Sequence, residues 1–172
     1  ILNIFLVFID WIVVLLYSDQ FIHVSGMIHW ASLGMYFKAT SWAISYIFLA
    51  KSASMLFLGN ELLAGMYMLG LNILGYQYAG LTGLGLSFLI GYFLYFVQVY
   101  LVTRYKYAFC SDPEFIRIFG YQGVLAITCF LTTLRSQDTF SYSLGSIVIV
   151  TSLLYSLLEL DKRLDLREIF TR

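Results

Sequence analysis

The stretch that decides the fold is residues 81–103, which reads LTGLGLSFLIGYFLYFVQVYLVT and contains no Asp, Glu, Lys or Arg. A helix needs about 20 apolar residues to cross the hydrocarbon of a bilayer, and this run is long enough. Inside a bilayer the backbone must satisfy its own hydrogen bonds, because no water is available there. We therefore expect residues 81–103 to form a membrane-spanning helix.

Comparable apolar runs recur on both sides of this stretch. Of the 172 residues, 60% are hydrophobic and only 12% are charged, whereas soluble domains carry about 25% charged residues. We predict an all-α integral membrane protein with about six transmembrane helices. The expected helices cover residues 2–18, 30–50, 62–78, 81–103, 118–134 and 140–158.

The expected bundle occupies residues 1–158, and a charged tail follows over residues 159–172. The tail is predicted either as an amphipathic helix on the membrane surface or as a solvated extension of the last helix. The chain opens on Ile1 without an initiator methionine, so we expect a piece of a longer protein.

The basic residues are distributed unevenly over the connections. If the first helix enters from the cytoplasm, eight of the ten Lys and Arg residues are cytoplasmic, Arg135 is outside and Lys38 lies within a helix. Basic residues favour the cytoplasmic side of a membrane, so both ends of this chain are predicted to be cytoplasmic. The net charge of zero gives no support to a nucleic-acid partner.

Two ionisable residues, Asp10 and Lys38, fall inside expected helices, where charges are costly and commonly functional. Each lies eight residues from the expected outer end of its helix, about 12 Å at 1.5 Å per residue. One interpretation is that Lys38, tuned by Asp10, lines a water-filled cavity and binds an anionic substrate. The alternatives are a structural ion pair between the two, or a Lys38 side chain that snorkels to the surface.

Polar and small residues also share a face on the expected helix of residues 62–78 and on Glu61, the residue before it. Glu61, Gly65, Met68 and Asn72 share one helical face. Glu61 and Asn72 are candidate substrate-binding residues. The alternative is a packing seam in which Gly65 permits close approach and Asn72 forms a hydrogen bond across it.

Small residues mark a close helix contact in the deciding stretch itself. Gly83, Ser87 and Gly91 recur every four residues, a spacing typical of tightly packed membrane helices. Enzyme signatures such as G-x-S-x-G and H-E-x-x-H do not occur. We therefore expect no enzymatic activity, no cofactor and no metal site.

Three segments of the sequence are distinctive: LYSDQF at residues 16–21, the stretch of residues 30–51 that ends in Ala-Lys, and LNILGYQYAGLTGLGLSFLIGY at residues 71–92. They resemble segments of bacterial polysaccharide flippases, the O-antigen translocases of the multidrug, oligosaccharidyl-lipid and polysaccharide exporter superfamily. The first is similar to the end of a helix in that family, and the third is the clearest match.

The resemblance implies translocation of a lipid-linked oligosaccharide, carried on undecaprenyl diphosphate, across the bacterial inner membrane. It implies alternating access between two lobes of six helices, with this chain as the C-terminal lobe. Membrane lipid and proteins of polysaccharide polymerisation or assembly would be its partners. Other interpretations are a cation-coupled drug or metabolite antiporter with Asp10 as the ion site, a membrane-embedded transferase, and a non-transporting scaffold.

Overall fold

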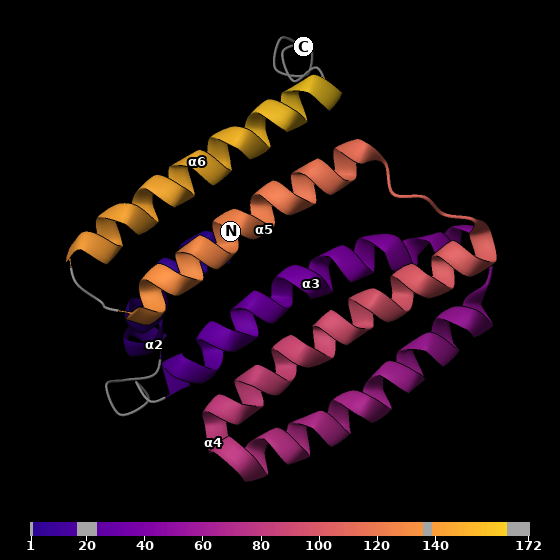
Figure 1. The fold of residues 1–172 in the computed structure, drawn as a ribbon, viewed down its shortest axis with the longest axis horizontal. Helices are drawn as coiled ribbons and strands as arrows, with labels where there is room; N and C mark the ends of the chain where they lie inside the picture. Colours follow the sequence, from indigo (N-terminus) through magenta and orange to yellow (C-terminus); the bar gives the residue numbers. More distant parts are fainter. Residues whose placement is uncertain (1, 17–23, 136–138, 165–172) are drawn as a thin grey trace.

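The computed structural model describes residues 2–16, 24–135 and 139–164, and all regular structure in these ranges is α-helical (Figure 1). The all-α prediction is confirmed. The helices are α1 (Leu2–Val7), α2 (Ile9–Leu16), α3 (Ser25–Ala50), α4 (Ser54–Tyr107), α5 (Pro113–Arg135) and α6 (Thr139–Leu164).

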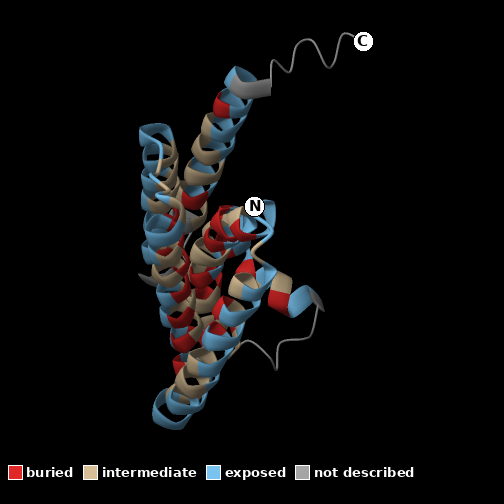
Figure 2. Cartoon of the chain, turned by 90° about the vertical axis from the view of Figure 1, so that its right-hand side faces the viewer, coloured by how far each residue is buried: buried red, intermediate tan, exposed pale blue. Residues whose placement is uncertain are grey.

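Three of the described helices are long and apolar enough to cross a membrane: α4, residues Pro113–Thr133 of α5 and residues Tyr142–Lys162 of α6. Only 6% of the apolar window of α6 is buried inside the protein, so most of its surface needs an apolar solvent. Figure 2 shows the same pattern, with buried residues in the middle of the bundle and exposed ones along the outer helices. The chain is therefore an all-α membrane protein.

Helix α4 is a hairpin of two arms, residues 54–78 and residues 81–107. The helical path breaks at Ala79 and at Gly80, where φ is +56°. Gly80 adopts this conformation without a steric penalty because it has no Cβ. The turn lies between the two helices expected over residues 62–78 and 81–103. Each arm is about 40 Å long at 1.5 Å per residue, which exceeds the hydrocarbon thickness.

The two arms touch through small residues, as the four-residue spacing predicts. A Cβ added to Gly83 would overlap the carbonyl oxygen of Gly75, so the two backbones are in direct contact. Ser87 donates its hydroxyl to the carbonyl oxygen of Leu71 on the opposite arm, at 2.8 Å. Gly91 lies against Met68. The predicted small-residue contact is confirmed, and the first arm of α4 is its partner.

Helix α3 packs along the second arm of α4 by the same principle. A Cβ on Gly85 would collide with the backbone of Met27, and one on Gly34 would press on the backbone near Leu89. The core between α3 and both arms is built from Ile44, Phe48, Ala64, Tyr95 and Val99. A second core cluster joins α1 to α5 through Leu6, Val7, Cys129 and Phe130.

Several helices are longer than expected. Helix α3 begins at Ser25, so His29, expected in a connection, is a buried helical residue whose Nδ1 lies 3.0 Å from the Ser25 carbonyl oxygen. Helix α4 begins at Ser54, which places Glu61 inside the helix. Helix α6 continues to Leu164, so the start of the predicted tail is part of the bundle. The remainder of that tail, residues 165–172, lies outside the described residues.

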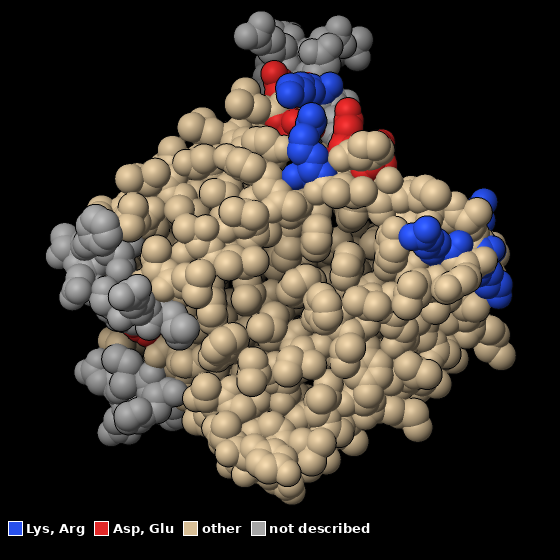
Figure 3. All heavy atoms as spheres, viewed as in Figure 1, with Lys and Arg blue, Asp and Glu red and all other residues tan. Residues whose placement is uncertain are grey.

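Apart from the end of α5 at Arg135, the helix ends that carry basic residues lie on one side of the molecule. In Figure 1 the end of α3, both ends of α4, the start of α5 and the end of α6 all lie toward the upper right. The charged side chains visible in Figure 3 gather mainly at the upper and right-hand edges of a broad uncharged face. We call this side of the molecule the basic end; it carries Lys51, Arg104, Lys106, Arg117 and Lys162.

We predict that Gly83→Ala lowers the thermal stability of the purified protein in detergent. The new methyl group would collide with backbone that cannot rotate away, a cost of about 1–3 kcal/mol or more. Gly65→Ala is the matched control in the same helix, because a Cβ there meets nothing within 4 Å. That substitution is expected to raise stability slightly through helix propensity. Equal melting temperatures for the two variants would contradict the direct contact of the arms.

Candidate functional site

Lys38 lies in the middle of α3 and is held by two aromatic rings. Its Nζ is 5.3 Å from the ring centroid of Trp42, one turn along α3, and 4.9 Å from that of Tyr92 on the second arm of α4. Both distances are within the range of cation–π attraction. Thirteen residues separate Ser25 from Lys38, about 20 Å of helix rather than the expected 12 Å. The ammonium group is thus far from either end of its helix.

The structure does not join Lys38 to Asp10. Within the described residues the ion pairs are Arg117–Glu159 and Lys162–Glu159, and neither involves Lys38 or Asp10. Asp10 lies in the first turn of α2, and its Oδ1 is buried without a hydrogen-bond partner in the described part of the chain. The predicted ion pair is therefore not formed, because Lys38 turns toward Trp42 and Tyr92.

Glu61 meets the second arm of α4. Its Oε1 accepts a hydrogen bond from the hydroxyl of Tyr95, and that hydroxyl is also within hydrogen-bonding reach of Ser45 on α3. Ser45 itself donates to the carbonyl oxygen of Trp42 at 2.9 Å. Tyr67 contributes a further buried hydroxyl, without a partner in the described residues. Glu61, Tyr95 and Ser45 therefore link α3 to both arms of α4.

An amide pair lies next along the arms of α4. Gln98 donates its Nε2 to Asn60, at 2.6 Å from Oδ1 and 3.0 Å from the backbone oxygen. Asn60 is buried, and its Nδ2 has no partner within the described chain. Gln98 is a strongly polar residue within the apolar stretch 81–103, and that stretch by itself does not indicate Asn60 as its partner.

The remaining residues predicted to share a face with Glu61 behave differently. Gly65 is exposed with open space beside it, so it does not permit a close helix contact. Asn72 is half-buried and makes no hydrogen bond to another described residue, so the predicted bond across the seam is absent. The close approach predicted for Gly65 is made instead by Gly75, which lies three residues after Asn72 on the same arm. Asn72 stays a predicted binding residue without a partner in the described chain.

These groups form one continuous feature, which we call the polar seam. It comprises Lys38, Trp42, Ser45, Glu61, Tyr92 and Tyr95, followed by Asn60 and Gln98. Lys38, Glu61 and Gln98 were visible in the sequence, whereas Tyr92, Tyr95 and Asn60 were missed. The helical spacing of Tyr92 and Tyr95 to Gln98, which places the three near one face, was the available signal.

The other side of the α3–α4 contact is apolar. A groove of about 440 Å³ lies between α3, the second arm of α4 and α5. Its wall includes Phe37 and Phe93, the sequence neighbours of Lys38 and Tyr92, and Phe119. Tyr36 stacks on Phe119 with ring centroids 4.9 Å apart and donates its hydroxyl to the Phe119 carbonyl oxygen. Neighbouring residues of α3 and α4 thus serve a polar seam and an apolar groove.

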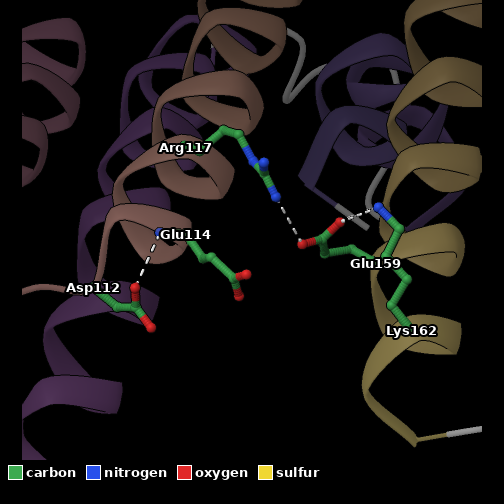
Figure 4. A network of polar contacts seen from close by, with 5 residues as sticks. All are labelled: Asp112, Glu114, Arg117, Glu159 and Lys162. Carbon is green, nitrogen blue, oxygen red and sulfur yellow. Dashed lines mark hydrogen bonds and ion pairs between the residues drawn. The ribbon is translucent and has the colours of Figure 1, made fainter.

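A second polar cluster joins α5 to α6 near the basic end (Figure 4). The carboxylate of Glu159 forms ion pairs with Arg117, at 3.4 Å between Oε1 and Nη2, and with Lys162, at 3.5 Å between Oε2 and Nζ. Deeper between the helices, Ser152 donates to Gln122 Oε1 at 2.7 Å. The two basic side chains are 62% and 71% exposed, so water screens these ion pairs and they add little to stability. We assign this cluster to helix packing.

The start of α5 explains the acids around Pro113. Asp112 accepts the backbone N–H of Glu114 at 3.4 Å, and its carbonyl oxygen accepts that of Ile116 at 3.1 Å. Asp112 therefore caps the helix, with Pro113 at the first helical position. Among the described residues no three His, Cys, Asp or Glu side chains gather to hold a metal ion. The polar seam offers one cation, Lys38, one carboxylate, Glu61, which is bonded to Tyr95, and aromatic, hydroxyl and amide groups.

Comparisons with known proteins add no identification. No protein-family model, curated protein or solved structure matches the chain. Function is therefore argued from the polar seam.

We predict that Tyr95→Phe and Glu61→Leu each destabilise the protein by about 1–2 kcal/mol, because each removes the hydrogen bond between these two side chains. The double variant should lose little more than the worse single variant, because the two side chains share one interaction. Unfolding in detergent measures all three. Tyr78→Phe is the control, since Tyr78 is 87% exposed. Fully additive losses would show that Glu61 and Tyr95 act independently.

Proposed function

We propose that this chain is one lobe of a transporter that moves an anionic, lipid-linked oligosaccharide across the bacterial inner membrane. The observation that carries the proposal is the Lys38 ammonium group, held at the middle of α3 by aromatic rings and by no carboxylate of the described chain. A buried carboxylate partner would neutralise such a charge. Aromatic rings stabilise it and leave its full charge available to a ligand.

A phosphate or diphosphate is the ligand that suits this cation. Lys presents a compact charge with three rotatable donors, so it accepts phosphate oxygens in varied geometries. An ionised group at membrane depth commonly marks a substrate path. The remaining seam offers hydroxyl and amide groups, from Ser45, Tyr95, Asn60 and Gln98, that suit polar substrate groups. Undecaprenyl diphosphate combines an anionic diphosphate with an apolar tail, and the resemblance of residues 71–92 to O-antigen translocases supports the same class.

The proposal treats the chain as half of the transport machinery. A single lobe offers one wall of a central cavity, and the second lobe would supply the other wall. Alternating access would then expose the seam to each side of the membrane in turn. Proteins of polysaccharide polymerisation or assembly would receive the product.

A second candidate is a cation-coupled antiporter for drugs or metabolites. The observation in its favour is Asp10, whose Oδ1 is buried and lacks a partner among the described residues. Such an oxygen could take a coupling ion. The two candidates differ in the residue they require: Lys38 for the lipid-linked substrate and Asp10 for the ion.

We predict that Lys38→Ala in the full-length protein abolishes surface polysaccharide in a strain that depends on it, with unchanged membrane abundance. Loss of the cation removes the charge that binds the diphosphate. Surface polysaccharide is read on gels of whole-cell extracts. Lys51→Ala, which alters an exposed lysine at the end of α3, is the control and should give wild-type levels. Wild-type polysaccharide in the Lys38→Ala strain would refute the proposal. Loss of cation-driven efflux in Asp10→Asn alone would favour the antiporter.

Orientation is part of the proposal, with the basic end on the cytoplasmic side. Cys110 offers a direct test, because it is an exposed free thiol in the connection between α4 and α5. We expect a membrane-impermeant maleimide to label Cys110 in inside-out vesicles and not in intact cells. Cys129 is buried and should stay unlabelled in both, and Cys110→Ser should abolish the signal. Labelling of Cys110 in intact cells would indicate the opposite orientation, with the basic end outside the cytoplasm.

A further inference from the structure

Trp42 is an exposed aromatic residue in the interior of α3, away from the ends of the helix. Its side chain is 53% exposed, and it lies eight residues before the end of α3 at Ala50, about 12 Å along the helix. Interfacial Trp and Tyr residues lie at the headgroup level. Tyr46, only four residues before Ala50 and 63% exposed, fits that belt. Trp42 lies further from the end of the helix, one turn from Lys38.

The position of Trp42 is tied to that of Lys38. The Lys38 ammonium group lies 5.3 Å from the indole centroid, so it occupies one side of the ring system. Tyr92 holds the same ammonium group from the second arm of α4, at 4.9 Å. The side chain of Trp42 therefore has a fixed position beside the cation while half of its surface stays open. A ligand group bound next to a phosphate on Lys38 would lie against this open surface.

A sugar is the group whose chemistry fits. One face of a pyranose ring presents C–H groups with a small positive charge, and an aromatic face carries negative charge from its π electrons. In a sugar diphosphate the first sugar is bonded directly to the phosphate. The same ligand would thus place its phosphate at Lys38 and its first sugar at Trp42. A lipid phosphate without a sugar would use Lys38 alone.

We propose that Trp42 is a specificity-determining residue that stacks on the first sugar of the lipid-linked substrate while Lys38 binds the adjoining phosphate. This inference rests on the proposed function and adds the recognition of the sugar. It predicts that Lys38 contributes to the binding of every polyprenyl diphosphate, whereas Trp42 contributes only to the binding of those that carry a sugar.

The test compares two probes on the full-length protein in lipid nanodiscs: undecaprenyl diphosphate and undecaprenyl-diphospho-N-acetylglucosamine. Trp42→Ala is expected to weaken binding of the sugar-bearing probe about tenfold and to leave the sugar-free probe within about twofold. Trp42→Phe, which keeps an aromatic face, should retain most of the affinity for the sugar-bearing probe. Trp11→Ala is the matched control, because Trp11 is 70% exposed on α2 and should affect neither probe.

The outcomes distinguish a failure of sugar binding at Trp42 from a failure of phosphate binding at Lys38. Equal loss for both probes in Trp42→Ala, or no loss for either, overturns the sugar platform while Lys38 keeps its role. If Lys38→Ala leaves the sugar-free probe bound as in the wild type, the phosphate site fails and the platform fails with it. A selective loss of the sugar-bearing probe in Trp42→Ala, rescued by Phe, supports the assignment.

Discussion

The backbone contact between the two arms of α4, at Gly75 and Gly83, underlies the candidate site. At Gly83 a Cβ would overlap the backbone of the other arm, so the arms can come together only because these positions lack a side chain. Folded back in this way, α4 presents Glu61 to Tyr95 and Asn60 to Gln98. The same hairpin directs Tyr92 toward Lys38 of α3. The polar seam therefore depends on a turn and a line of small residues that themselves carry no chemistry.

Membrane surroundings explain why the polar groups gather along this seam. A polar side chain exposed to hydrocarbon has no water with which to form hydrogen bonds, so contacts within the protein are its main partners. Glu61 and Gln98 find such partners on the facing arm. Lys38 finds aromatic rings, which stabilise a cation without cancelling its charge. This difference is why we assign binding to Lys38 and mainly helix association to the amide pair.

The two sides of the α3–α4 contact are chemically distinct. Neighbouring residues on a helix point about 100° apart. Lys38 and Phe37 therefore face different directions, and so do Tyr92 and Phe93. One side carries the polar seam, and the other carries the apolar groove against α5. The α3–α4 contact therefore presents a polar surface and an apolar surface that are built from neighbouring residues.

Hydropathy was enough to predict the helical class and the break between residues 78 and 81, because both follow from local composition in an apolar solvent. The four-residue spacing of Gly83, Ser87 and Gly91 was enough to predict a close helix contact. The predicted helices were too short at ends where polar residues such as His29 and Glu61 are helical, because hydropathy does not assign such residues to a membrane span. The partners of Lys38 could not be predicted, since Asp10 and Tyr92 were both compatible with its position along α3. Side-chain direction and the packing of α3 against α4 chose Tyr92 and Trp42. Local sequence thus determined which segments are helical, whereas the tertiary packing decided which polar groups meet, because contacts between helices depend on rotation and register that no single segment encodes.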